Sequence, residues 1–233
     1  MIPVLLGWPY RRLDPQTRKA FEVALHAGTA VALLLASRSE VVQAARELDG
    51  PRALAAALAL TPPAAAGILF EHGIEERLGA PRDVARVQIV AALLLAGADR
   101  RPADRDYAAA GPLDHLLIGL AQAAALVPGV SRNGATLTAA RLRRVDRGSA
   151  HRLSRAAALP VLVAAGGLKG ARLARRGMPP GLWRPFAAGF GAAALSALGA
   201  WRLLKRFDQP ASYAPLAGYR LAFGLVSLCA SRR

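Results

Sequence analysis

Three long stretches without a charged residue constrain the fold of this chain more than any other feature of its sequence. Ala53–Phe70 contains 18 residues, Pro185–Trp201 contains 17 and Leu116–Ser131 contains 16. A transmembrane helix needs about 20 mostly apolar residues, and a slightly shorter stretch can still span because flanking Arg and Lys side chains reach the interface. Shorter apolar runs occur at Val23–Ser37, Val87–Ala98, Ala156–Leu168 and Leu221–Ser231. This pattern predicts an all-α polytopic membrane protein.

We expect about six transmembrane helices in one integral membrane domain that covers residues 1–233. Their expected ranges are 20–37, 53–71, 84–99, 149–168, 183–205 and 213–230. Pro62 and Pro63 lie inside the second range, and we interpret the pair as a kink without a function. Lys and Arg are almost evenly divided between the loops on the two sides, so the positive-inside rule leaves the orientation open.

The net charge of +16 does not indicate a nucleic-acid-binding protein. Such a module gathers its basic residues on one soluble face, together with aromatic side chains or a recognition helix. Here only 6% of the residues are aromatic, and the 31 Lys and Arg lie in blocks between apolar stretches. Four His and one Cys are too few for a disulfide framework or a Cys/His zinc site, so no metal ligands are assigned. Cys229 is expected to be a small buried hydrophobic side chain.

The segment 113–145 does not fit the pattern of a simple span. Its first arm, Leu113–Val127, is apolar, Pro128-Gly129 follows, and the second arm becomes basic after Leu137. A Pro-Gly pair stops a helix and starts a turn. Irregular backbone at membrane depth is tolerated only where protein buries it or where it lines a watery cavity. We therefore interpret 113–145 as a re-entrant helical hairpin.

The residues after this break have the chemistry of a phosphate-binding cradle. Gly129 and Gly134 would let the backbone approach a ligand closely. If a helix begins at about Ser131, its first free N–H groups favour an anion at the break. Arg132 adds a permanent positive charge on a planar group that suits phosphate oxygens.

Further polar side chains surround Arg132. Thr136 follows four residues later and shares a helix face with it, and Ser131 and Asn133 add donors. The alternative is a juxtamembrane loop whose arginine contacts lipid headgroups. The cluster after a Pro-Gly break favours the site, since ionisable groups inside a membrane are usually functional. The arginines at 141, 143, 144, 147 and 152 are instead interpreted as a loop that contacts headgroups.

Residues 121–136, AQAAALVPGVSRNGAT, resemble the second signature of the undecaprenyl-diphosphate phosphatases, also called bacitracin-resistance proteins. The usual form in that family is PGxSRSGxT, so Asn133 stands where a serine is usual. Three more segments resemble the family: residues 21–29 its FxVxLHxGT helix, residues 154–166 its FSFLLxxPxxxGA stretch with Arg155 in place of an aromatic, and residues 219–220 its late YR pair. The resemblance runs from residue 1 to nearly residue 230.

This resemblance implies hydrolysis of undecaprenyl diphosphate to undecaprenyl phosphate and phosphate, which recycles the lipid carrier of cell-wall synthesis. It implies a multi-pass protein of the bacterial plasma membrane, in contact with membrane lipids and with the polyprenyl diphosphate substrate. Inverted repeats are also implied, with 1–112 a remnant of the first and 113–233 the second, and the site at their interface. Arg132 and Ser131 are then the catalytic residues, and Gly129, Asn133, Gly134 and Thr136 bind the substrate. The sequence leaves open whether the chain forms a homodimer.

One family feature is absent from residues 1–233. The first signature, two glutamates followed by PxSSxGH, precedes the segment that Met1–Trp8 resembles. The resemblance implies a divalent cation, Mg²⁺ or Ca²⁺, and this chain lacks the glutamates that would hold it. Glu22 and His26 could share a helix face, and we interpret them as the polar start of a helix. Either the start has been assigned too late, which the abrupt apolar beginning favours, or the chain is a degenerate copy that binds without turnover.

Two functions therefore compete. The first is hydrolysis of a polyprenyl diphosphate, in which Arg132, Ser131, Thr136 and backbone amides hold the diphosphate and stabilise charge at phosphorus. The second is a non-hydrolytic membrane carrier or binding protein for a phospholipid-like anion. Because the chain has a cradle and no pair of acids, we expect it to bind the lipid diphosphate and to hydrolyse it slowly.

Overall fold

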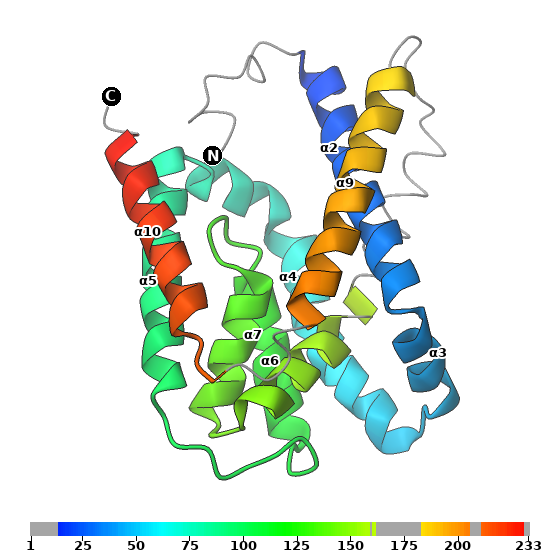
Figure 1. The fold of residues 1–233 in the computed structure, drawn as a ribbon, viewed down its shortest axis with the longest axis vertical. Helices are drawn as coiled ribbons and strands as arrows, with labels where there is room; N and C mark the ends of the chain where they lie inside the picture. Colours follow the sequence, from blue (N-terminus) through cyan, green and yellow to red (C-terminus); the bar gives the residue numbers. More distant parts are fainter. Residues whose placement is uncertain (1–13, 159, 162–182, 206–210, 231–233) are drawn as a thin grey trace. The chain divides into compact units, whose positions relative to one another are not determined.

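The apolar stretches of the sequence form helices (Figure 1). A computed structural model describes residues 14–158, 160–161, 183–205 and 211–230. Within these ranges the only β-type pairing is one isolated bridge between Arg105 and Val145. The helices are α2 (Pro15–Ala36), α3 (Arg38–Arg46), α4 (Gly50–Leu78), α5 (Pro81–Asp99), α6 (Pro112–Ala124), α7 (Arg132–Leu142), α9 (Trp183–Lys205) and α10 (Ala214–Ala230), and residues 147–158 are also helical.

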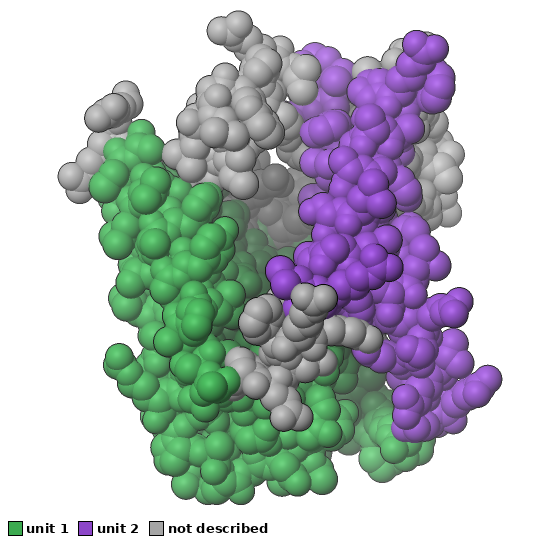
Figure 2. All heavy atoms as spheres, viewed as in Figure 1, with its two compact units in different colours: residues 1, 49–158, 209–233 green, residues 2–48, 159–208 purple. Residues whose placement is uncertain are grey.

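The chain forms two compact units (Figure 2). One contains residues 49–158 and 209–233, and the other contains residues 2–48 and 159–208. In the second unit α2 packs against α9. The contact is close because glycines form it: a Cβ atom added to Gly28 would lie 2.2 Å from the carbonyl oxygen of Phe190, and one added to Gly189 would lie 2.9 Å from the ring of Phe21.

The expected spans are confirmed as helices where the structure describes them. The expected ranges 20–37, 53–71, 84–99 and 213–230 correspond to α2, α4, α5 and α10, and 183–205 coincides with α9. The range 149–168 is helical at 149–158 and 160–161, and the rest of it lies outside the described residues. Two described helices are long and apolar enough to cross a membrane, over Gly50–Phe70 and Trp183–Leu203.

The segment 113–145 has the predicted helix–break–helix form. α6 ends at Ala124, and α7 begins after Ser131, which caps it by accepting a hydrogen bond from the Gly134 N–H at 3.2 Å. α6 packs against α4 and α7, and α7 also packs against α5. The core of this unit contains Ala59, Leu95, Ile118, Leu137, Ala140, Val145, Ala150, Leu153, Ala157, Tyr213 and Ala217.

The two ends of this hairpin meet. The Asp146 N–H donates to the carbonyl of Arg105 at 2.8 Å, and the N–H groups of Asp104 and Arg105 donate to the carbonyl of Arg144 at 3.2 and 3.3 Å. The chain that leads into α6 and the chain that leaves α7 are therefore joined at the same end of the unit.

Cys229 is exposed, so the prediction that it is buried was wrong. α10 packs on α5, and its buried residues are Ala217, Gly224 and Ser227. These positions repeat at helical spacing and define one face, and Cys229 lies two residues past Ser227, on another side of the helix.

Arg141, in the last turn of α7, is buried, so the prediction that it belongs to a headgroup-contacting loop was wrong for this residue. Arg141 is 2% exposed, and it donates to the carbonyl oxygens of Val145, Asp99 and Arg101. The Arg147 Nε atom lies 2.6 Å from Oδ1 of Asp99. Arg143 and Arg144 form ion pairs with aspartates 114 and 104, each at 2.7 Å. The sequence did not show these partners because all of them except Val145 lie 29 residues or more away along the chain.

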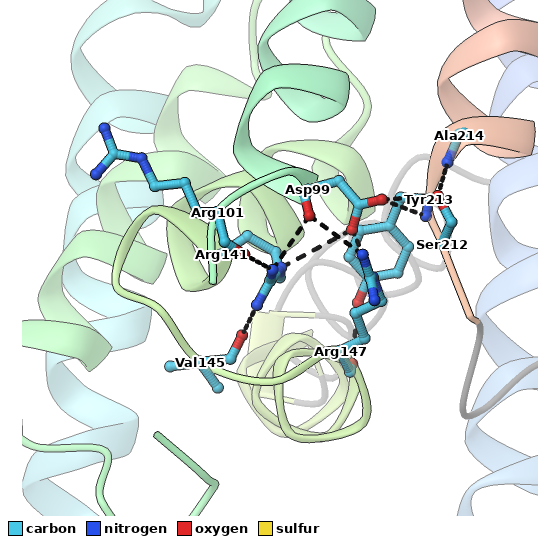
Figure 3. A network of polar contacts seen from close by, with 8 residues as sticks. All are labelled: Asp99, Arg101, Arg141, Val145, Arg147, Ser212, Tyr213 and Ala214. Atoms are coloured by element: carbon cyan, nitrogen blue, oxygen red, sulfur yellow. Dashed lines mark hydrogen bonds and ion pairs between the residues drawn. The ribbon is translucent and has the colours of Figure 1, made fainter. Parts of the chain in front are cut away.

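Figure 3 shows Arg141, Arg147 and Tyr213 converging on Asp99 at the end of α5. Oδ2 of Asp99 accepts hydrogen bonds from Ser212 Oγ and from the Tyr213 N–H, both at 2.8 Å. The Tyr213 hydroxyl donates to the carbonyl of Arg147 at 2.9 Å. One buried carboxylate thus joins α5 to the helical segment 147–158 and to the residues just before α10.

A second buried carboxylate, Asp114, lies in the first turn of α6. The Nη1 and Nη2 atoms of Arg105 donate to its carboxylate at 3.1 and 2.7 Å, and Nε of Arg143 donates to it at 2.7 Å. The Gly111 N–H adds a fourth hydrogen bond at 2.9 Å. Burial alone would raise the pKa of this carboxyl, but these hydrogen bonds outweigh burial and lower the pKa well below its ordinary value.

Candidate functional site

The beginning of α7 presents hydrogen-bond donors. Ser131 Oγ accepts from the Gly134 N–H, and the Ser131 carbonyl accepts from the Ala135 N–H at 2.8 Å. Among the described residues, the N–H groups of Arg132 and Asn133 make no hydrogen bond, as is usual in the first turn of a helix. A helix beginning at Ser131 was predicted, and this is confirmed.

The Arg132 side chain is half-buried at this position. Its Nη1 atom lies 3.5 Å from Oε1 of Gln122, and this is its only hydrogen bond to a described side chain. Gln122 is buried on α6, and its Nε2 atom donates to the carbonyl of Ala59 on α4 at 3.0 Å. The guanidinium therefore keeps most of its five donors for another partner.

Gly129 has a different reason to be glycine from the one inferred from the sequence. Its φ is +99°, a conformation that side chains with a Cβ disfavour. An added Cβ would also lie 2.4 Å from the carbonyl oxygen of Val84, so the neighbour that excludes a side chain here is α5. Arg220 of α10 donates to the Gly129 carbonyl at 2.9 Å, and Gln88 of α5 donates to the carbonyl of Arg220 at 3.0 Å.

Gly134 occupies a less crowded position than Gly129. A Cβ added there would lie 3.5 Å from Cβ of Ser131, which is an ordinary contact. Gly134 therefore acts through its N–H in the cap, and the space around it does not require a glycine.

Thr136 and Asn133 are connected through Ser154 of the helical segment 147–158. The Thr136 and Ser154 hydroxyl oxygens lie 2.7 Å apart, and Ser154 donates to Oδ1 of Asn133 at 2.9 Å. Thr136 and Ser154 are 1% and 6% exposed, whereas Asn133 is exposed. Because the side-chain oxygen Oδ1 of Asn133 faces Ser154, the side-chain NH₂ group of Asn133 points away from Ser154.

Three residues at this site were not predicted as site residues. Gln122 is the one amide in the uncharged stretch 116–131, and an isolated polar residue there was the available signal. Ser154 and Arg220 were named from the sequence only as parts of segments that resemble the family, and no role in the site was assigned to them. Their contacts join positions 21 and 91 residues apart, which no local pattern shows.

The described residues include no group of three or more His, Cys, Asp or Glu that could hold a metal ion. The buried carboxylates in this unit, Asp99 and Asp114, are bound by arginines. The donors that the described residues present at the start of α7 are thus suited to an anion.

The comparison with protein families decides the relationship. The family of the bacitracin resistance protein BacA matches residues 2–226. The chain belongs to this family. A protein of Geobacter sulfurreducens named undecaprenyl-diphosphatase is 39% identical over 242 residues, which cover 96% of this chain and 86% of that protein. Proteins with the same name from Pelobacter propionicus and Chromohalobacter salexigens are each 36% identical, over 96% of this chain and 85% and 86% of their own lengths.

Membership of the BacA family confirms the resemblance drawn from the sequence motifs. In this member, the PGVSRNGAT motif forms the break and the first turn of α7. The catalytic roles assigned to Arg132 and Ser131, and the binding roles assigned to Gly129, Asn133, Gly134 and Thr136, remain predictions.

Proposed function

We propose that this protein hydrolyses undecaprenyl diphosphate to undecaprenyl phosphate and inorganic phosphate, and so recycles the lipid carrier of cell-wall synthesis. The observation that carries this proposal is the identity of up to 39%, over 96% of the chain, to proteins named undecaprenyl-diphosphatase. The donor-rich start of α7 supports it, because the substrate group that must be held is a multiply charged anion.

In this reaction the oxygen of water becomes bonded to the terminal phosphorus, and the bond from that phosphorus to the bridging oxygen breaks. Undecaprenyl phosphate leaves with the bridging oxygen. Arg132, the Ser131 hydroxyl and the N–H groups of Arg132 and Asn133 bind the phosphate oxygens and stabilise the negative charge that develops on them. These groups are donors, so their contribution is binding and electrostatic stabilisation.

A divalent cation, Mg²⁺ or Ca²⁺, is part of the proposal. The described residues do not supply a set of ligands for it, and none of the steps above includes it. We expect phosphate release to fall after treatment with EDTA and to recover when Mg²⁺ or Ca²⁺ is restored. Full activity in EDTA would contradict this part of the proposal.

The membrane arrangement that we propose is multi-pass, with six spans and a re-entrant hairpin at 113–145 in the cell membrane. The joined ends of the hairpin support this arrangement, because the chain enters and leaves it at one end of the unit. The proposed contacts with the diphosphate come from one chain, so the proposal does not require a homodimer.

The direct test is release of inorganic phosphate from undecaprenyl diphosphate by the protein purified in detergent. We expect release that follows the amount of protein and stops when the cradle is altered. If the protein binds the lipid diphosphate and releases no phosphate, the carrier function replaces hydrolysis.

A further inference from the structure

The two prolines inside α4 leave one carbonyl group without a helical donor. In an α-helix a carbonyl accepts from the N–H four residues later, and in a tighter turn from the N–H three residues later. For Ala59 these residues are Pro63 and Pro62, and neither has an N–H. α4 nevertheless continues through both prolines, and Ala59 is 1% exposed. An unsatisfied carbonyl here would cost free energy, so it needs another donor.

Gln122 of α6 supplies this donor. Its Nε2 atom lies 3.0 Å from the Ala59 carbonyl oxygen. α6 can approach the backbone of α4 closely because Gly119 has no side chain. A Cβ added to Gly119 would lie only 2.4 Å from the carbonyl oxygen of Leu58. The glycine thus brings Gln122 within reach of the carbonyl that the prolines expose.

This hydrogen bond also fixes the orientation of the Gln122 amide. A carbonyl oxygen can only accept, so the NH₂ group must face Ala59 and Oε1 must face the other way. On that side lies the guanidinium of Arg132, with Nη1 3.5 Å from Oε1. If the amide were reversed, Oε1 of Gln122 would face the Ala59 carbonyl oxygen, and both atoms are acceptors. The NH₂ group of Gln122 would then face the guanidinium of Arg132, and both groups are donors.

We propose that Gln122 is a positioning residue for Arg132 and that Pro63, by exposing the Ala59 carbonyl, holds Gln122 in its orientation. The inference rests on the proposed function, in which Arg132 binds the diphosphate. The Pro62-Pro63 pair, interpreted from the sequence as a kink without a function, thereby acts on the site through two hydrogen bonds.

The test compares two neighbouring substitutions, Pro63→Ala and Pro62→Ala. Pro63→Ala returns an N–H to the Ala59 carbonyl, removes the clash that tilts this carbonyl, and lets it turn back along the helix away from Gln122. Pro62→Ala is the matched control, since its N–H lies four residues after Leu58 and returns the helical donor to that carbonyl, whereas it could reach the Ala59 carbonyl only in a tighter turn. Both changes replace a proline inside a helix, so both should keep or raise the melting temperature.

Binding of farnesyl diphosphate to the full chain in detergent separates the two variants. We expect the dissociation constant to rise about tenfold in Pro63→Ala and to stay within about twofold in Pro62→Ala. In an Arg132→Lys background, Pro63→Ala should have no further effect, because its action passes through Arg132. If Pro63 had a purely structural role, Pro63→Ala would lower both the melting temperature and the affinity for farnesyl diphosphate. The affinity would then fall by the same factor in the unmodified chain and in the Arg132→Lys background.

Equal binding by Pro63→Ala and Pro62→Ala overturns the inference and leaves the proposed function intact. An additive effect in the Arg132→Lys background also overturns it. If the unmodified chain binds no farnesyl diphosphate, the proposed function fails and this inference fails with it. If Pro63→Ala does not fold, Gln122→Glu replaces it: a carboxylate cannot donate to Ala59 and pairs with Arg132, so unchanged binding by that variant overturns the inference.

Discussion

A guanidinium group that binds a diphosphate must keep its donors free until the substrate arrives. Arg132 meets this condition, because one long hydrogen bond of 3.5 Å is all that joins it to a described side chain. The buried Arg141 is the opposite case, with its nitrogens directed at three carbonyl oxygens of its own unit. The difference in partners separates an arginine suited to a ligand from one that stabilises the fold.

Substitution of Arg132 tests its role at this scale. Arg132→Lys keeps the charge and removes the planar, bidentate geometry, so we expect phosphate release or lipid diphosphate binding to fall by about tenfold or more. Arg144→Lys is the control, because Arg144 is exposed and its ion pair within the described part of the chain is with the half-exposed Asp104. Its activity should stay close to that of the unmodified protein, and equal losses in both variants would remove the cradle from the site.

Ser154 gives a second prediction for a single residue. Ser154→Ala removes the hydroxyl that donates to Asn133 and contacts the Thr136 hydroxyl, and Ser154 itself is only 6% exposed. We expect the free energy of unfolding to fall by about 1–2 kcal/mol and binding of the diphosphate to weaken, since the Asn133 amide is then free to rotate. Thr138→Ala is the control, because the Thr138 hydroxyl donates to the carbonyl of Gly134 in its own helix at 2.8 Å. No difference between these variants would contradict the connection through Ser154.

At the scale of elements, the hairpin α6–α7 depends on the two groups of residues that close its open end. The bridge between Arg105 and Val145 and the four hydrogen bonds to Asp114 hold the entering and leaving chains together. α4 and α5 pack on the arms, and Gly129 lies directly against the backbone of α5.

The topology of this element can be measured by labelling cysteines. In a background with Cys229 replaced, single cysteines at Asp106 and Arg144, both exposed, should react with a membrane-impermeant reagent from one side only, and from the same side. Both positions lie at the closed end of the hairpin, which explains this expectation. Labelling from opposite sides would make 113–145 an ordinary span and remove the structural reason for a site at its break.

The helices and the break of this element were predictable because local patterns encode them. Pro128-Gly129 marks the break, and the hydroxyl of Ser131 before an arginine and a glycine marks the start of α7. The neighbours were not predictable: nothing in the sequence shows that Gly129 meets Val84, or that Gln122 meets Ala59. Arg141 was misinterpreted for the same reason, since its partner Asp99 lies 42 residues earlier.

At the scale of the whole protein, acid should weaken the unit that holds the site. The pKa of Asp114 is lowered in the folded state, so its contribution to stability is complete above its ordinary pKa of about 3.9 and is lost as the pH falls below it. Asp114→Asn should lower the free energy of unfolding at pH 7 by about 3 kcal/mol, because two arginines lose a buried partner. The difference in melting temperature from the unmodified protein in detergent should shrink toward pH 3. A constant difference over this range would show that the charge of Asp114 is not responsible.

The hydrogen-bond partners of Asp99 have a consequence for the order in which this protein folds during translation. Its carboxylate receives the N–H of Tyr213, which is synthesised 114 residues later. At a translation rate of roughly 5–20 residues per second, α5 leaves the ribosome ~6–23 s before this partner exists. During that interval the buried end of α5 lacks the donors Ser212 and Tyr213, which precede α10, so the first unit cannot be completed until these residues are translated. The residues just before α10 complete this unit, so a ribosome that stalls before residue 212 leaves a nascent chain whose Asp99 carboxylate still lacks two of its donors.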